Sequence, residues 1–171
     1  MAQSTFQGPV RSLSGFISQG PNTVTTAGAT AAITVANNAG KITNVAATSA
    51  ITLPAVNVTA NPASSGPGQD PNTANNLGAS YTFFLPATAS SVTITTASGD
   101  FLLGQIVIGP SGGGAASMFA ANGTSTTTIT LNGGTTGGIK GSFISVVAVA
   151  ANTYMVYGKL LGTATLATPF S

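Results

Sequence analysis

The sequence predicts an all-β fold: a single antiparallel β-sandwich or barrel, jelly-roll-like, with an extended N-terminal arm over residues 1–21. Three observations predict it. Thr, Val, Ile and Gly dominate and alternate at a period of two, as in strands with one buried face. Glu, Lys, Arg and Met, which favour helix interiors, are scarce. Pairs such as Asn122-Gly123 and Asn132-Gly133 tolerate the positive φ angles that tight turns require. Since 171 residues suffice for one substantial core, residues 22–171 are expected to form one β-domain.

Short β-type runs follow one another along this domain. The runs expected to be strands cover residues 31–35, 41–45, 50–53, 80–85, 91–96, 101–108, 126–131, 141–149 and 153–160. The last two are expected to form a terminal hairpin across Ala150-Ala151-Asn152. Its single apolar face is expected to hold Phe143, Val147, Val149, Tyr154, Val156 and Leu160. No segment recurs at a fixed period of about 20 to 50 residues, which argues against a solenoid or a propeller.

Three segments differ from these strands. Residues 1–21 carry isolated apolar side chains without strict alternation, and Gly8-Pro9 and Gly20-Pro21 favour an extended chain there. Residues 57–76 are rich in Asn, Pro, Ser and Gly, and exceed the roughly 12 to 15 residues of an ordinary loop, so we expect a long polar loop. Residues 109–116 form a Gly-rich link.

The charge content excludes most chemistry. The chain has four Lys or Arg, two Asp or Glu, and no His, Cys or Trp. A zinc site therefore lacks both of its usual ligand types, and acid–base catalysis would depend on Asp70 and Asp100, which both stand in turn sequences. We expect no enzymatic activity and no cofactor. The few cations are dispersed, so we expect no nucleic-acid partner.

Two features of the sequence bear on where the protein is made and on whether it enters a membrane. Residues 1–20 lack the basic start and the apolar run of a secretion signal. The longest wholly apolar run is 146–151, far shorter than the roughly 20 residues of a spanning helix. We therefore expect synthesis in the cytoplasm without a signal peptide, and no membrane partner.

A calcium loop is an alternative that the sequence leaves open. Asp70, Asn72, Asn75 and Asn76 supply oxygen ligands and begin with a D-x-N pattern. The pattern lacks a bidentate Glu, so a loop built from Asx turns is the favoured interpretation. In residues 133–142, Gly, Lys and Ser stand in the wrong order for a phosphate-binding loop, and a turn between strands is favoured.

The Thr tracts at 93–96 and 125–130 suggest a second alternative. A flat array of hydroxyl groups could bind ice or glycans, but a lattice match needs a fixed repeat, which we do not find in the sequence. Ordinary strands with an outward Thr face are the favoured interpretation, because Thr has high β-propensity.

Six segments between residues 51 and 158 resemble, in their order, the small β-rich decoration or cement proteins of tailed bacteriophage heads, and more weakly the β-domains of phage fibres. They are Ile51-Thr52-Leu53-Pro54, Gly78-Ala79-Ser80-Tyr81-Thr82-Phe83, Thr95-Thr96-Ala97-Ser98-Gly99-Asp100, Leu131-Asn132-Gly133-Gly134-Thr135-Thr136-Gly137-Gly138, Gly141-Ser142-Phe143 and Tyr154-Met155-Val156-Tyr157-Gly158. The pattern usually has Trp where Tyr154 stands.

The resemblance implies a non-enzymatic protein of the virion that lies on the outer surface of the capsid and stabilises the shell. Its partner would be the major capsid protein. We also expect a homo-oligomer, a trimer in preference to a dimer, because so uncharged a chain needs its apolar surface covered. The capsid-contact candidates lie in the arm and are Phe6, Arg11, Leu13, Phe16 and Ile17. The alternatives are a phage fibre or tail component that binds a host receptor or glycan, and a non-viral surface adhesin or envelope protein.

Overall fold

The computed structural model describes residues 24–59, 75–163 and 165–171, and these form a mostly β structure, which confirms the all-β prediction. The strands are β1 (Val24–Ala27), β2 (Thr30–Ala32), β3 (Lys41–Val45), β4 (Thr48–Thr52), β5 (Ser80–Phe84), β6 (Ser91–Thr95), β7 (Phe101–Pro110), β8 (Ser117–Asn122), β9 (Thr128–Leu131), β10 (Phe143–Ala150) and β11 (Thr153–Gly162). A four-residue helix, α1 (Val35–Asn38), follows β2, and the Thr34 side chain caps it by accepting from the Asn37 N–H.

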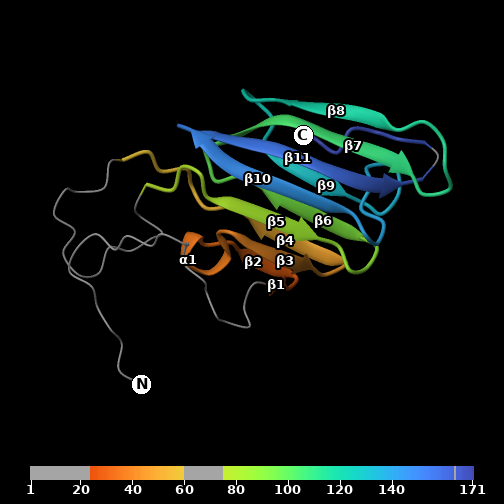
Figure 1. Ribbon diagram of the computed structural model, residues 1–171, viewed down its shortest axis with the longest axis horizontal. Helices are drawn as coiled ribbons and strands as arrows, with labels where there is room; N and C mark the ends of the chain where they lie inside the picture. Colours follow the sequence, from red (N-terminus) through yellow and green to blue (C-terminus); the bar gives the residue numbers. More distant parts are fainter. Residues whose placement is uncertain (1–23, 60–74, 164) are drawn as a thin grey trace, which may run out of the picture.

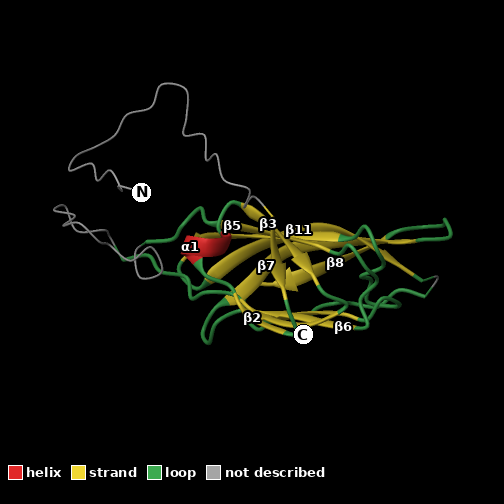
Figure 2. Ribbon diagram, turned by 90° about the horizontal axis from the view of Figure 1, so that it is seen from below, coloured by secondary structure: helices red, strands yellow, loops and turns green. Residues whose placement is uncertain are grey.

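The strands form two sheets that face each other (Figures 1 and 2). A seven-stranded sheet has the order β1-β3-β5-β10-β11-β7-β8, and a four-stranded sheet has the order β2-β4-β6-β9. Both sheets have edges, so neither closes into a barrel.

Alternating side chains of both sheets fill the space between the layers. Phe83, Leu102 and Ile144 of the larger sheet and Ile94 and Ile129 of the smaller one are fully buried. Each such side chain contributes roughly 1.5 to 3 kcal/mol by leaving water. Burial of one face of each sheet therefore holds the two layers together and leaves two outer faces.

The pairing corrects the antiparallel, jelly-roll-like expectation, because both sheets are mixed. β1 with β3, β3 with β5, β11 with β7, β2 with β4, and β4 with β6 run parallel. The antiparallel pairs are β5 with β10, β10 with β11, β7 with β8, and β6 with β9.

The first six strands also correct the argument against a solenoid. They alternate between the two sheets, so the chain winds around the core with β1, β3 and β5 stacked in one layer and β2, β4 and β6 in the other. The turns have unequal length. Ile42 pairs with Val24, eighteen positions earlier, and with Thr82, forty positions later, because the second turn contains residues 57–76. No fixed period was therefore visible.

The expected terminal hairpin is confirmed, but its apolar face was assigned wrongly. β10 pairs with β11 in the register Val147↔Met155 and Ala148↔Tyr154. Phe143 and Val147 therefore point outward, whereas Tyr154, Val156 and Leu160 are buried between the sheets. Both faces of this hairpin carry apolar side chains.

Candidate interaction surface

Asp100 has a structural role. It is buried at the turn before β7, and its Oδ2 accepts from the Val56 N–H at 2.8 Å. Its carbonyl oxygen accepts from the Thr96 hydroxyl at 2.7 Å. Burial raises the pKa of the carboxyl, although the bond from Val56 acts in the opposite direction. These contacts tie the chain after β4 to the start of β7.

The calcium alternative falls mostly outside the described residues, which do not include Asp70 or Asn72. Asn76 is buried, and its side chain accepts from the Asn57 N–H and donates to the Ala55 carbonyl, both at 2.8 Å. The Asn75 side chain accepts from the Leu77 N–H at 3.0 Å. The Asn76 amide thus closes the base of the 57–76 segment, whereas the Asn75 amide forms a local Asx turn. In the described part of the chain, no group of three His, Cys, Asp or Glu residues could hold a metal ion.

Two tyrosines meet in the core, with ring centroids 6.4 Å apart and planes at 64°. The Tyr154 hydroxyl donates to the Pro54 carbonyl at 2.7 Å. The buried Tyr81 hydroxyl has no hydrogen-bond partner. Burial raises the pKa of Tyr81 to about 12 and raises that of Tyr154 further. Tyr154 therefore fixes the chain after β4, and Tyr81 serves mainly as an apolar ring.

The outer face of the four-stranded sheet is hydroxyl-rich. Cross-strand rows bring Thr30, Ala50, Thr93 and Thr130 side by side, and Ala32, Thr52, Thr95 and Thr128 next to them. The Thr128 and Thr95 hydroxyls bond to each other at 3.3 Å. None of the large exposed hydrophobic side chains lies on these strands. The sequence-based expectation of an outward Thr face is confirmed here.

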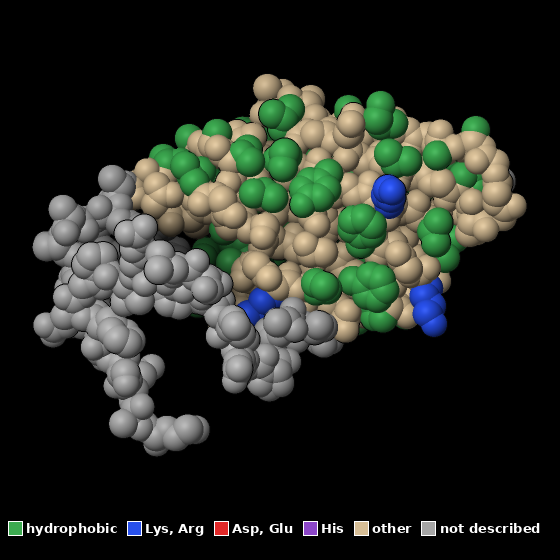
Figure 3. All heavy atoms as spheres, in the orientation of Figure 1, with side chains coloured by type: hydrophobic (Ala, Val, Ile, Leu, Met, Phe, Trp, Pro, Cys, Tyr) green, Lys and Arg blue, Asp and Glu red, His purple; other side chains and the backbone are tan. Residues whose placement is uncertain are grey.

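The outer face of the seven-stranded sheet differs. Most large hydrophobic side chains that are exposed on described residues stand on its strands: Ile42, Phe84, Leu103, Met118, Val149, Met155, Tyr157 and Leu161. Figure 3 shows hydrophobic side chains spread over this face among other side chains and backbone atoms. We call this surface the apolar face.

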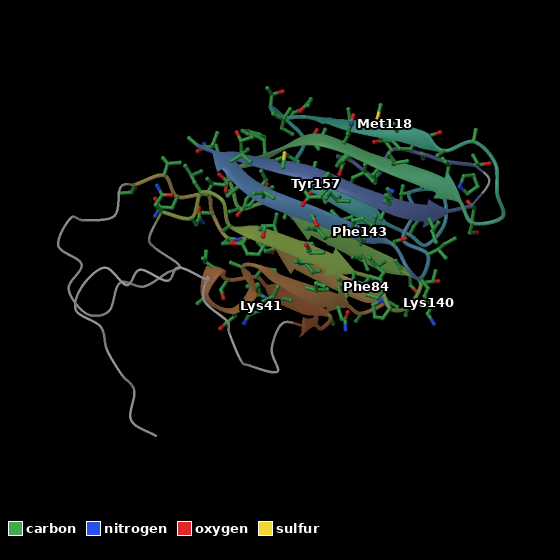
Figure 4. All side chains as sticks on the ribbon, in the orientation of Figure 1. Lys41, Phe84, Met118, Lys140, Phe143 and Tyr157 are labelled. Carbon is green, nitrogen blue, oxygen red and sulfur yellow. The ribbon has the colours of Figure 1, made fainter. Side chains whose placement is uncertain are left out.

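One row crosses the apolar face from β5 to β8. Strand pairing places Phe84, Phe143, Lys159, Val107 and Met118 next to one another in that order. At one end of the row lies a shallow hollow of about 420 Å³, lined by Ile42, Asn44, Thr82, Phe84 and Phe143. At the other end Met118 is 63% exposed. Figure 4 shows Phe84 and Phe143 on one side of Tyr157 and Met118 on the other.

The capsid-contact candidates predicted from the sequence, Phe6, Arg11, Leu13, Phe16 and Ile17, lie outside the described residues. Sequence reasoning missed the apolar face. A signal for it exists, because strands with one wet face alternate, whereas Leu102-Leu103 and Met155-Val156-Tyr157 place apolar side chains on both faces. Among the residues described, no helix is long and apolar enough to cross a membrane.

Comparisons of the chain with models of known protein families, with curated proteins and with solved structures find no match.

Proposed function

We propose that this chain is a virion structural protein, a decoration or cement protein that binds the outer surface of a bacteriophage head and stabilises the shell. The observation that carries the proposal is the apolar face, because a broad, nearly uncharged apolar surface is typical of a protein that works by binding protein chains, its own copies included. Depletion of charge is typical of the cores of protein–protein interfaces. Asp100 is the single Asp or Glu among the described residues, and it has a structural role, because its carboxylate accepts a hydrogen bond from the Val56 N–H.

Stabilisation of a shell requires no side-chain chemistry. A protein that binds the assembled shell, and not its separate subunits, shifts the equilibrium toward the shell by mass action. The effect is about 2.7 kcal/mol per site when the free protein is at a hundred times its Kd. A β-domain with few charges suits this task because the task needs only a surface that fits.

We propose that the arm supplies the attachment to the major capsid protein. It precedes β1, an edge strand of the seven-stranded sheet, so it joins the β-domain at that edge. Phe6, Leu13, Phe16 and Ile17 are large apolar residues, and burying each is worth roughly 1.5 to 3 kcal/mol before the cost of ordering the chain. Arg11 is the single cation among residues 1–21.

Deletion of residues 1–20 tests this attachment. The truncated protein should keep the thermal unfolding of the full chain but co-sediment more weakly with undecorated heads of the phage that encodes it. Equal binding by the truncated protein would move the attachment surface to the β-domain. Copy number tests the head location itself: hundreds of copies in each purified virion support decoration, and a handful would place the protein in the tail.

A fibre or tail component that binds a glycan is the second candidate, and Tyr157 is the observation that favours it. This side chain is exposed on the apolar face, between Ser145 and Gln105 in the cross-strand register. An exposed aromatic ring beside the exposed Gln105 amide could bind both the apolar side and the hydroxyls of a sugar, while the Ser145 hydroxyl is buried and bonds to that of Thr82. Glycan binding that disappears in Tyr157→Ala, together with a low copy number, would favour this candidate.

A further inference from the structure

We propose that the apolar face binds the same face of a second copy of this chain, about a two-fold axis that runs along β11. This pairing stands apart from the proposed attachment to a phage head, because it concerns the protein alone. It also differs from the trimer that the sequence favours.

The shape of the face carries the inference. The hollow is centred on β5, which lies two strands from β11 on one side, and Met118 stands on β8, two strands from β11 on the other. Met118 also belongs to the same cross-strand row as Phe84 and Phe143, which line the hollow. A two-fold axis in the plane of the interface and parallel to β11 exchanges the two sides of the sheet at the same height along the strands. Met118 of each copy then faces the hollow of the other.

Met118 and the hollow are also chemically suited to each other. Met is unbranched and adaptable, and it fills irregular apolar spaces. The hollow offers it the aromatic rings of Phe84 and Phe143 and the aliphatic side chain of Ile42. A more than half exposed Met and an open apolar hollow would thus both be covered by a single symmetric contact.

The size of the face suits a stable dimer. From β3 to β8 the face spans five strand spacings of about 4.8 Å, and eight residues of a strand extend about 26 Å, which gives roughly 600 Å² in projection. Accessible area exceeds the projection because side chains stand out from the sheet. A standard interface buries about 800 Å² per partner, so the two values are comparable.

The face carries too little charge to select a charged partner, and a second copy adds one like-charge pair to the interface. Lys159 is the single charged side chain at the outward positions of the described strands β3, β5, β10, β11, β7 and β8. None of these positions holds a carboxylate. An acidic or basic partner would therefore gain little. Lys159 lies on β11, so the two copies bring their lysines together near the axis, where their long stems can turn toward solvent. Added salt screens this pair, and the dimer should tighten as salt is raised.

Thiol cross-linking tests the axis directly, because the chain contains no Cys and each variant carries one defined thiol. Facing sheets lie about 10 Å apart, so a bifunctional thiol reagent of that span is appropriate. Lys159→Cys should cross-link to itself. Met118→Cys should not, because its two copies would be about four strand spacings, or roughly 19 Å, apart along the sheet. A mixture of Met118→Cys and Thr82→Cys chains should give the mixed cross-link.

Self-linking of Met118→Cys would overturn the proposed axis. A monomeric mass of the full chain at micromolar concentration, with no cross-links in any mixture, would overturn the pairing itself. Pairing that arises only after residues 1–20 are deleted would also contradict it, since the arm would then be what covers the face.

A charge variant with a matched control completes the test. Met118→Asp should weaken dimerisation by at least about tenfold, because it places a carboxylate against an apolar hollow. Leu77→Asp is the control, since Leu77 is a large exposed apolar residue on a turn outside both sheets. Both variants should keep the parent's thermal unfolding. Equal dimer masses for Met118→Asp and Leu77→Asp would contradict the proposal.

Discussion

The two outer faces of this protein are built from the same kind of strand but present opposite chemistry. The four-stranded sheet presents Thr, Ser and Ala to solvent, with no large exposed hydrophobic side chain. The seven-stranded sheet presents Phe84, Met118, Tyr157 and other large apolar side chains. Both faces hold few of the charged residues that usually keep a surface soluble: none stands on the strands of the four-stranded sheet, and Lys159 stands on the outer face of the other. The hydroxyl groups of the first face can bond to water, whereas the second face gains free energy when another surface covers it.

Low charge alone therefore does not mark an interface. Both faces have low charge, and they differ only in the size and polarity of their side chains. The apolar face would gain free energy from a covering partner, whereas the hydroxyl-rich face can bond to water.

The largest expected effect comes from the loop that connects β9 of one sheet to β10 of the other. Gly138 lies buried between β9 and β10 at φ 101°, and a Cβ there would be 2.9 Å from the Cβ of Leu131 and 3.0 Å from that of Ala89. Gly138→Ala should lower the free energy of unfolding by roughly 3 to 5 kcal/mol, since it adds backbone strain to overpacking. Urea unfolding measures this.

Gly99→Ala is the matched control for that variant. Gly99 also has a positive φ, of 90°, but a Cβ there would meet no atom within 4 Å. It should cost only about 1 to 2 kcal/mol, which is the backbone term alone. Equal losses for the two variants would show that packing between the sheets does not matter at Gly138.

The next effect is the dependence of stability on pH, and it comes from a tyrosine on the inner side of the seven-stranded sheet. Burial raises the pKa of Tyr81 from 10.0 to about 12, so the folded state keeps a proton that the unfolded state loses above pH 10. The stabilisation is fully present below pH 10 and falls as pH rises toward about 12, by up to roughly 3 kcal/mol. With no His or Cys, stability should change little between about pH 6 and 9. Denaturant unfolding at a series of pH values checks both statements, and a steep change near neutrality would contradict them.

The two core tyrosines give a smaller, paired effect. Tyr154→Phe should cost about 1 to 3 kcal/mol, because it leaves the buried Pro54 carbonyl without its donor. Tyr81→Phe should be neutral or slightly stabilising, since its hydroxyl makes no hydrogen bond. Thermal unfolding of both variants checks the order, and a larger loss for Tyr81→Phe would mean that its hydroxyl has a partner in solution.

The smallest effect sharpens the contrast between the outer faces. Thr52→Val on the hydroxyl-rich face and Val107→Thr on the apolar face should each change the free energy of unfolding by no more than about 0.5 kcal/mol. Their effects on self-association should differ, because only Val107 lies in the row that we propose to be covered. Sedimentation velocity should show a few-fold weaker dimer for Val107→Thr and no change for Thr52→Val.

Much of the fold follows from local patterns. Alternation predicted the positions of most strands, including β10 and β11, and turn residues such as Ser98-Gly99 separate strands as expected. β1 was missed because Val-Thr-Thr-Ala is only four residues long and shows no apolar alternation, and β8 because Ser-Met-Phe-Ala-Ala-Asn holds few strongly β-forming side chains. The parallel pairings were missed because strand partners depend on contacts between distant residues rather than on local sequence.

The candidate site was less predictable. One step of register decides whether Val147 lies opposite Met155 or Tyr154, and that step moves a side chain from the core to the surface. The sequence shows that β11 is apolar at consecutive positions, but it does not show that β3, β5, β10, β11, β7 and β8 lie side by side. The apolar face is therefore a property of the assembled sheet.

The most direct test of this account compares one charge on each outer face. Leu103→Asp and Thr93→Asp both place a carboxylate at an outward strand position, one on each sheet. Sedimentation velocity of the full-length variants should show an intact dimer for Thr93→Asp and a Kd raised by at least about tenfold for Leu103→Asp. A dimer that Thr93→Asp disrupts and Leu103→Asp leaves intact would contradict the account and assign binding to the hydroxyl-rich face.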